Sequence, residues 1–285
     1  MSYDIIVVGS GPAGLSAAVQ ARARGKSVLV VTGSEKDSAL YKAEKVDNYL
    51  GLPGLSGAQL LGRFTAHARK AGAEIREGHI LFIMSMNGKF FVSVDSDVEE
   101  AGAVVLATGV TRGKKYPGEE QFLGRGVSYC ATCDGALYKD KPVTVVGLSA
   151  DAPREAEFLY RLGCQVTYVA GKRPEELKEA IPFVKGVSLE IQGNQKVERL
   201  VADGQVLPCD CVFMMRASLA PTDLLPGLEL RDGYIAVDRD ARTNIPGVFA
   251  AGDCTGVPLQ VSNAVGEGLV AGHQAAAYLD QHRSN

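Results

Sequence analysis

A glycine-rich turn near the start of the chain limits the fold more than any other segment. It reads Gly9-Ser10-Gly11-Pro12-Ala13-Gly14, between an apolar run at residues 5–8 that predicts a buried strand and a pattern that predicts a helix. In such a unit Gly9 permits the tight turn, Gly11 lets the backbone approach a pyrophosphate, and Gly14 brings helix and strand close together. The flanking strand and helix favour this interpretation over a glycine turn without a ligand, so we expect an α/β domain that binds a dinucleotide.

The acid that usually binds the ribose in such a domain is displaced here. It is expected at the end of the second strand, residues 27–31, but Thr32 stands there and the first acid is Glu35. Glu35, with Lys36 beside it, can reach a ribose hydroxyl if the loop curls back. An acid in a solvated loop is the alternative.

Two later strands also end in residues suited to a ligand. Residues 103–106 predict a buried strand that ends in Ala107-Thr108-Gly109, where small side chains leave room for a ligand or for a close-packed backbone. Near the C-terminus a strand ends in Gly252-Asp253, and a helix rich in small residues is expected from about 263 to 279. The N-terminus of that helix would be electropositive.

A pair of cysteines predicts redox chemistry. In Cys130-Ala131-Thr132-Cys133-Asp134-Gly135 the two thiols can close a small disulfide ring at a helix start, and Asp134 could shuttle the proton of a sulfur. A zinc site would need a second pair, and Cys209 and Cys211 are only one residue apart. These two alternate on a predicted strand, so we expect them to share one face and to serve packing.

The composition is that of an ordinary soluble protein. The 285 residues, 46% hydrophobic and 22% charged, suggest about two domains. A net charge of −3 and a pI near 5.9 predict no nucleic-acid partner. The N-terminal apolar run is too short for a signal peptide or a membrane span, so we expect a cytoplasmic protein. In that reducing compartment, six cysteines favour catalysis over a disulfide scaffold.

A second strand–turn–helix unit begins at Pro142 but keeps only part of the fingerprint. Its turn reads Gly147-Leu148-Ser149-Ala150-Asp151-Ala152. Ser149 stands where a second glycine would let a pyrophosphate approach, and Asp151 adds a negative charge nearby. The sequence therefore argues against a normal nicotinamide-dinucleotide site here.

Together these motifs resemble, in the same order, those of the low-molecular-weight thioredoxin reductases, which are FAD-dependent two-domain disulfide reductases. The first turn resembles the family's FAD pyrophosphate turn, and residues 32–36 and 46–49 resemble its Thr-Gly-x-Glu-Lys and Val-Glu-Asn-aromatic segments. Residues 107–109, 130–135 and 245–253 match as well. The resemblance covers nearly the whole chain, and the two-cysteine hexapeptide and the final Gly-Asp are its most specific parts.

The resemblance implies a domain plan. It predicts two Rossmann-like three-layer α/β domains, with an FAD domain of residues 1–113 and 219–285. A smaller redox-disulfide domain of degenerate pyridine-nucleotide type, residues 114–218, interrupts the first. Family members are homodimers in which the small domain rotates, and the linkers near 113 and 218 would be the hinges.

The resemblance also implies roles for single residues. Cys133 would face the flavin, Cys130 would attack the substrate disulfide, and Asp134 would act as acid and base. No metal site is expected. The residues expected to bind FAD are Gly9, Ser10, Gly11, Pro12, Ala13, Gly14, Glu35, Lys36, Leu40, Tyr41, Asn48, Ala107, Thr108, Gly109, Gly252, Asp253, Gln260 and Val261.

Two segments depart from the family. Where the family has Gly-Gly-Gln-Leu beside the flavin, this chain has Asp37-Ser38-Ala39-Leu40, followed by Tyr41, which could stack on the flavin ring or pack on its neighbours. Where the family binds the 2′-phosphate of NADPH with His-Arg-Arg, this chain has Gly171-Lys172-Arg173 after Ala170. The fork that would clamp a phosphate is lost, so a role for NADPH is doubtful.

These features predict a flavoprotein disulfide oxidoreductase. It would pass electrons from FAD through the Cys130–Cys133 disulfide to a thioredoxin-like protein or another dithiol substrate, with a ferredoxin-like donor in place of NADPH. Four alternatives stay open: a small-molecule dithiol oxidase that uses oxygen, an NAD(P)H-dependent reductase, a second site for another adenine dinucleotide, and a non-catalytic flavin redox sensor.

Overall fold

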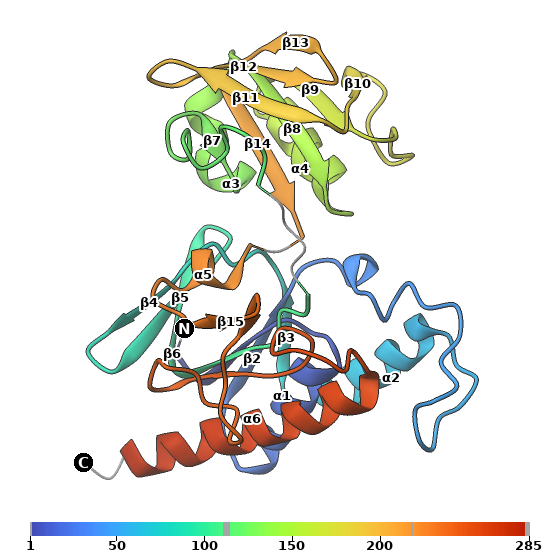
Figure 1. The fold of residues 1–285 in the computed structure, drawn as a ribbon, viewed down its shortest axis with the longest axis vertical. Helices are drawn as coiled ribbons and strands as arrows, with labels where there is room; N and C mark the ends of the chain where they lie inside the picture. Colours follow the sequence, from blue (N-terminus) through green and yellow to red (C-terminus); the bar gives the residue numbers. More distant parts are fainter. Residues whose placement is uncertain (1, 111–114, 218, 283–285) are drawn as a thin grey trace. The chain divides into compact units, whose positions relative to one another are not determined.

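The chain folds into two compact units. The computed structural model describes residues 2–110, 115–217 and 219–282. The first unit is Met1–Thr111 with Ser218–Asn285, and the second unit is Arg112–Ala217. The predicted boundaries and hinges near 113 and 218 lie outside the described residues. Both units combine helices with a parallel sheet (Figure 1), which confirms the predicted α/β class.

The first unit contains most of the helices. Its elements are β1 (Ser2–Val8), α1 (Pro12–Ala23), β2 (Val28–Thr32), η1 (Glu35–Asp37), α2 (Gly57–Lys70), β3 (Glu74–Glu77), β4 (Ile83–Met86), β5 (Lys89–Val94), β6 (Asp97–Leu106), α5 (Pro221–Leu224), β15 (Leu230–Arg231), β16 (Tyr234–Ile235), β17 (Val248–Ala250) and α6 (Val261–His282). Helix α2 begins with a capping box, in which Ser56 and Gln59 each accept a hydrogen bond from the other's backbone N–H.

The main sheet of the first unit brings four predicted ligand segments to one edge. Its order is β3-β2-β1-β6-β5-β4, with β17 also paired to β6. In the parallel part Val8 pairs with Val31 and with Leu106, and Leu106 pairs with Ala250. The segments that follow β1, β2, β6 and β17 therefore leave the sheet at the same edge, because the carboxyl ends of parallel strands meet there.

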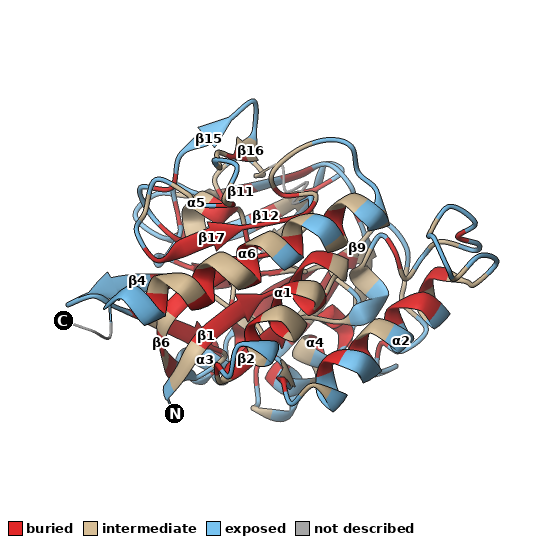
Figure 2. Cartoon of the chain, turned by 90° about the horizontal axis from the view of Figure 1, so that it is seen from below, coloured by how far each residue is buried: buried red, intermediate tan, exposed pale blue. Residues whose placement is uncertain are grey.

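Helices α1 and α6 pack unusually close together (Figure 2). A Cβ atom added at Gly268 would lie 2.1 Å from the carbonyl oxygen of Ala13, and one at Gly272 would lie 2.3 Å from that of Ala17. The small residues predicted along the last helix are therefore needed for this contact. The contact fixes the first half of α6 beside the glycine-rich turn.

The second unit is a smaller three-layer structure. Its elements are β7 (Val127–Ser128), α3 (Ala131–Asp134), η2 (Gly135–Tyr138), β8 (Pro142–Leu148), α4 (Ala152–Arg161), β9 (Gln165–Ala170), β10 (Phe183–Lys185), β11 (Leu189–Gly193), β12 (Val197–Ala202), β13 (Gln205–Pro208) and β14 (Cys211–Arg216). The parallel sheet β10-β9-β8-β14-β7 has α4 packed in the core on one face and the antiparallel sheet β11-β12-β13 packed on the other.

The expectation that two cysteines share one face is wrong. Cys211 begins β14 and packs in the core beside α4, whereas Cys209 packs in the core beneath the antiparallel sheet. The strict alternation fails because Cys209 lies before the strand, across the bend at Asp210. Both are buried, as expected for packing residues.

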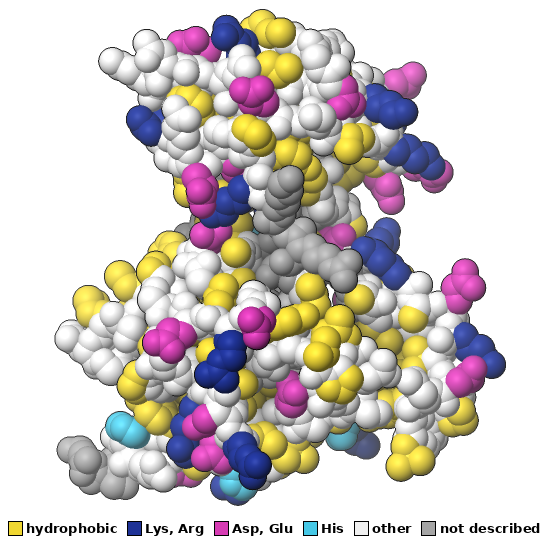
Figure 3. Space-filling view, in the orientation of Figure 1, with side chains coloured by type: hydrophobic (Ala, Val, Ile, Leu, Met, Phe, Trp, Pro, Cys, Tyr) yellow, Lys and Arg dark blue, Asp and Glu magenta, His cyan; other side chains and the backbone are white. Residues whose placement is uncertain are grey.

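Two further features are the distribution of surface charge and the length and polarity of the helices. On the visible face, Lys and Arg side chains are interspersed with Asp and Glu (Figure 3). None of the helices in the described ranges is both long and apolar enough to cross a membrane.

Candidate functional site

The glycine-rich turn has the geometry that its sequence predicts. Gly9 has a φ of +106°, and a Cβ atom there would lie 2.3 Å from the carbonyl oxygen of Ala107. A Cβ atom at Gly14 would lie 1.9 Å from the carbonyl oxygen of Gly9. Around Gly11, by contrast, a Cβ atom would meet no heavy atom of the described structure within 4 Å. Two glycines are thus required by packing, and Gly11 leaves room for a ligand at the start of α1.

Polar residues on the neighbouring strand support this turn. The Ser10 and Thr32 hydroxyl oxygens lie 2.6 Å apart, and Thr32 donates to the carbonyl oxygen of Gly33 at 2.9 Å, so Ser10 is the donor of the pair. Glu35 and Lys36 are exposed on the short helix η1, which begins three residues after β2 ends. This position leaves Glu35 within the loop that follows the ribose-binding strand in such folds.

A hydrogen bond joins two of the residues expected near a flavin ring. Asn48 donates from Nδ2 to Oε1 of Gln260 at 2.8 Å, although the two residues are far apart in sequence. Leu40 is buried, and Tyr41 is partly buried against the same core, so at least part of the Tyr41 ring serves packing. Val261 is the first residue of α6 and also contacts this core.

The segment after β6 contains a polar atom suited to a ligand. The Thr108 hydroxyl oxygen is buried and has no hydrogen-bond partner among the described residues. A buried hydroxyl without a partner is destabilising unless a ligand or water completes it. Beside it Gly109 has a φ of +68°, and a Cβ atom there would also meet nothing within 4 Å in the part of the chain that the structure describes.

The segment after β17 is held by an acid, Glu267, that no sequence pattern indicated. Glu267 of α6 accepts hydrogen bonds from the backbone N–H of Gly252 at 2.7 Å and from the Thr255 hydroxyl at 2.9 Å. The pKa of Asp253 is raised, mainly by burial and to a lesser extent by the negative charge of Glu267. Gly252 has a φ of +85° and approaches Ala13 so closely that a Cβ atom would lie 2.7 Å from the Ala13 Cβ.

These segments fit a dinucleotide with a flavin, such as FAD. The open approach at Gly11 suits a pyrophosphate at a helix N-terminus, and the orphan hydroxyl of Thr108 could donate to a ligand. The structure brings the residues after β1, β6 and β17 together at one edge of the sheet. The loop residues Asn48 and Gln260 contact each other.

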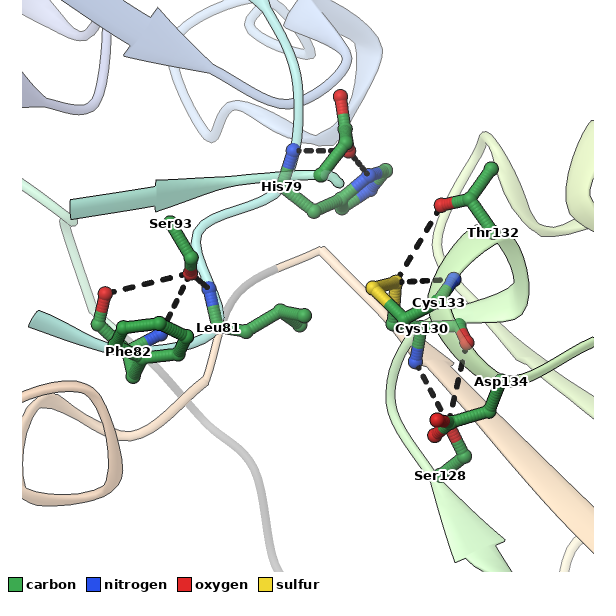
Figure 4. Close-up of a disulfide and its surroundings, with 10 residues drawn as sticks. His79, Leu81, Phe82, Ser93, Ser128, Cys130, Thr132, Cys133 and Asp134 are labelled. Atoms are coloured by element: carbon green, nitrogen blue, oxygen red, sulfur yellow. Dashed lines mark hydrogen bonds and ion pairs between the residues drawn. A yellow bond between two sulfur atoms is a disulfide. The ribbon is translucent and has the colours of Figure 1, made fainter. Parts of the chain in front are cut away.

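The second unit holds a disulfide between Cys130 and Cys133. Cys130 is the N-cap of the one-turn helix α3, and its sulfur accepts a hydrogen bond from the Cys133 backbone N–H at 3.1 Å. The Thr132 hydroxyl lies 3.4 Å from the same sulfur (Figure 4). Both donors would stabilise negative charge on the Cys130 sulfur after the ring opens. Cys133 is the more exposed of the pair.

Asp134 is bound to a serine that the sequence analysis did not select. The Ser128 hydroxyl donates to Oδ2 of Asp134 at 2.6 Å and accepts from the Cys130 backbone N–H at 3.1 Å (Figure 4). Its position two residues before the first cysteine was the only available signal. That signal is weak, because a serine there also caps turns without any catalytic role.

A buried tyrosine packs against the first glycine of the second turn. A Cβ atom at Gly147 would lie 1.9 Å from the hydroxyl oxygen of Tyr168, whose side chain is 1% exposed. Burial, and then the charge of Glu176, raise the pKa of Tyr168 to about 12, so this hydroxyl stays neutral. Helix α4 follows with Asp151 as its N-cap and Pro153 in its first turn, where proline supplies no N–H.

The remaining arginine of the degenerate phosphate segment is also engaged. Arg173 donates to the carbonyl oxygens of Ile181 at 3.4 Å and Lys178 at 3.2 Å, and its guanidinium lies 5.9 Å from the ring centre of Phe183. The sequence predicted the loss of the phosphate clamp. It did not predict Tyr168, because that residue reaches the turn from the next strand, β9.

Comparisons with known proteins show to which family the chain belongs. The sequence matches the family described as pyridine nucleotide-disulphide oxidoreductase over residues 3–268. A thioredoxin reductase from Aquifex aeolicus is 35% identical over 308 residues, covering 99% of this chain and 94% of the relative.

Solved structures are similar over the same length. A ferredoxin-flavin thioredoxin reductase from Clostridium acetobutylicum superposes with a TM-score of 0.94 at 39% identity, covering 100% of both chains. A thioredoxin reductase from Gloeobacter violaceus superposes with a TM-score of 0.87 at 30% identity, covering 99% of this chain and 95% of the other. The chain therefore belongs to the pyridine nucleotide-disulphide oxidoreductase family, as a flavoprotein of the low-molecular-weight thioredoxin reductase type.

Proposed function

We propose that the protein passes electrons from FAD through the Cys130–Cys133 disulfide to the disulfide of a thioredoxin-like protein, and that its electron donor is a ferredoxin-like protein. The residues proposed for FAD are those predicted from the sequence, in the segments after β1, β2, β6 and β17 and in the loops of Leu40, Tyr41, Asn48 and Gln260. The homodimer and the cytoplasmic location implied by the family belong to the same proposal.

One observation carries the choice of donor. The second turn, where a nicotinamide dinucleotide would bind, has Ser149 at the position that the open Gly11 holds in the first turn, and the Tyr168 hydroxyl packs against its first glycine, Gly147. The next helix follows the acidic Asp151, its N-cap, and has a proline without an N–H in its first turn. A side chain at the position of closest approach, a nearby carboxyl group and a missing N–H all oppose a phosphate, which needs room and N–H donors. A structural relative described as a ferredoxin-flavin thioredoxin reductase supports the same donor.

The residues around the disulfide suit their proposed work. When bound, FAD would supply the electron pair that reduces the disulfide. Cys130 then attacks the partner's disulfide as a thiolate, stabilised by the Cys133 N–H and by the Thr132 hydroxyl at 3.4 Å from its sulfur. Asp134 gives and takes the proton that a departing sulfur needs. Cys133 closes the ring again and releases the reduced partner.

The donor is tested anaerobically with the purified holoprotein. NADPH and NADH are added in separate cuvettes, and reduced ferredoxin in a third, while the flavin absorbance is followed. We expect neither nucleotide to bleach the flavin within seconds, whereas reduced ferredoxin bleaches it and supports repeated reduction of thioredoxin. Cys130→Ser is the matched control, because it should still be bleached by ferredoxin and yet reduce no thioredoxin.

The other outcomes assign the alternatives. Rapid bleaching by NADPH or NADH would overturn the proposed donor and leave a pyridine-nucleotide-dependent reductase. Oxygen uptake with a small dithiol, without thioredoxin turnover, would indicate a dithiol oxidase. Flavin reduction without turnover of any disulfide would indicate a redox sensor.

A further inference from the structure

A single buried hydroxyl connects the proposed acid and base to the reactive cysteine. Ser128 is 4% exposed at the end of β7, where its backbone pairs with Phe213 of β14. Its Oγ lies 2.6 Å from Oδ2 of Asp134, 3.1 Å from the Cys130 nitrogen and 3.2 Å from the Cys130 carbonyl oxygen (Figure 4). The sheet holds this serine at a fixed place, so its three neighbours are held as well.

The hydroxyl has one proton and two acceptors within reach. While Asp134 is ionised, the shorter and charge-assisted bond to its carboxylate takes that proton, and the Ser128 oxygen accepts from the Cys130 N–H. When Asp134 is protonated, its carboxyl can donate to the Ser128 oxygen. The serine proton then turns toward the Cys130 carbonyl oxygen at 3.2 Å.

We propose that Ser128 is a positioning residue that holds the Asp134 carboxyl in both protonation states while thiols and disulfides exchange. The inference rests on the proposed acid and base role of Asp134. A hydroxyl is suited to it because it both donates and accepts, whereas a methyl group could do neither. The backbone bond from the Asp134 N–H to the Cys130 carbonyl oxygen, at 3.3 Å, keeps the same two residues in register.

The step in question can be followed with an external dithiol. One thiolate of dithiothreitol bonds to the Cys130 sulfur, the Cys130–Cys133 bond breaks, and its electron pair leaves on the Cys133 sulfur. That sulfur takes the proton of Asp134, which regains one from the second thiol of the dithiol. The second thiolate then displaces the Cys130 sulfur, which takes from water the proton that the first thiol released when it ionised, leaving oxidised dithiothreitol and two cysteine thiols. Two electrons and two protons have moved to the protein.

The test compares four variants of the full-length holoprotein: Ser128→Ala, Ser128→Thr, Asp134→Asn, and the double variant Ser128→Ala with Asp134→Asn. Disulfide opening by dithiothreitol is stopped with acid at successive times, the free thiols are alkylated, and the products are counted by mass spectrometry. We expect Asp134→Asn to slow opening about 100-fold, the lower end of the range for a lost acid or base.

The pattern among the variants carries the inference. Ser128→Ala should slow opening about tenfold, the loss expected for one hydrogen bond to a charged group. Ser128→Thr should stay within about twofold of the parent, because it keeps the hydroxyl. The double variant should be no slower than Asp134→Asn alone, since the serine acts only through the carboxyl.

Four results would contradict the inference. A Ser128→Ala variant as fast as the parent, or effects of the two single variants that multiply in the double variant, would show that Ser128 does not act through Asp134. A Ser128→Thr variant as slow as Ser128→Ala would indicate a packing role. If Asp134→Asn itself opens at the parent rate, the proposed role of Asp134 fails, and the inference fails with it. Because dithiothreitol replaces donor and thioredoxin, an error in either proposed partner leaves the test unaffected.

Discussion

The cysteines fall into two chemical classes that thiol reagents should separate. Four of them are buried free thiols outside the Cys130–Cys133 disulfide: Cys164, Cys209, Cys211 and Cys254. Burial raises the pKa of Cys209 to about 11 and that of Cys254 to about 11, and it raises the pKa of the other two as well. The thiolate is the reactive form, so below these pKa values the four thiols stay protonated and inert.

We therefore expect the oxidised native protein to react negligibly with Ellman's reagent at pH 8. After reduction and removal of the reductant, only Cys130 and Cys133 should react, and denaturant should release the other four. Peptide mapping of alkylated protein checks which residues are labelled. Rapid labelling of Cys164 or Cys211 in the folded, oxidised protein would contradict the burial of these side chains.

At the scale of single residues, spacing predicted some roles and missed others. Cys130, Cys133 and the three glycines of the first turn were predictable because their chemistry depends on neighbours within six positions of sequence. Glu267 was not, because it reaches Gly252 and Thr255 only after α6 has packed beside β17. A local sequence pattern does not indicate a contact that forms only when distant segments of the chain pack together.

The turn between β1 and α1 predicts a contrast between two substitutions of the same kind. Gly14→Ala would place a methyl group 1.9 Å from the Gly9 carbonyl oxygen, so we expect it to lower the free energy of unfolding by about 3 kcal/mol. Gly11→Ala meets no described atom within 4 Å and has a φ of −68°, so the apoprotein should lose only about 1 kcal/mol, the usual cost of alanine at a helix N-cap. Its affinity for FAD should fall more than about tenfold.

Urea unfolding of the apoprotein and fluorescence titration with FAD measure the two effects. Gly62→Ala is the control, because Gly62 is exposed inside helix α2 and its replacement should raise stability by about 0.5–1 kcal/mol. Unchanged FAD affinity in Gly11→Ala would remove this turn from the cofactor site.

At the scale of helices and strands, apolar runs in the sequence predicted where most elements lie. They did not predict the residues at which those elements begin and end. The turn predicted to begin at Gly147 starts later, because β8 continues to Leu148 before α4 begins at Ala152. The packing of Tyr168 from β9 against Gly147 fixes this turn. A propensity argument weighs each segment alone, so it could not anticipate a side chain supplied by the neighbouring strand.

For the whole molecule, the division into two units places the proposed functions in separate cores. All residues proposed for FAD belong to the first unit, and the disulfide belongs to the second unit. In the second unit a buried ion pair joins the beginning of the unit to its last strand. The Glu119 side chain is 0% exposed. Its carboxylate accepts hydrogen bonds from Nε and Nη2 of Arg216, and from the Tyr129 hydroxyl at 3.0 Å.

Removing the charge of Glu119 should therefore destabilise one unit and spare the other. Glu119→Gln removes the buried carboxylate that pairs with the largely buried Arg216, and breaking a buried pair from one side costs about 3–5 kcal/mol. Pulses of maleimide in rising urea, followed by mass spectrometry, report each unit through a buried thiol: Cys211 for the second unit and Cys254 for the first. We expect Cys211 to become labelled at lower urea in the variant, with Cys254 labelling and FAD affinity unchanged.

A neighbouring acid provides the matched control for this whole-molecule prediction. Glu120 pairs with Lys115 at the surface, where its side chain is 72% exposed, so Glu120→Gln should change stability by less than about 0.5 kcal/mol. If Glu119→Gln exposes both thiols at the same lower urea concentration, the two units unfold as one cooperative structure. If neither thiol becomes labelled at a lower urea concentration, the ion pair contributes little to the stability of the second unit. Buried ion pairs often stabilise a protein no more than well-packed apolar residues would.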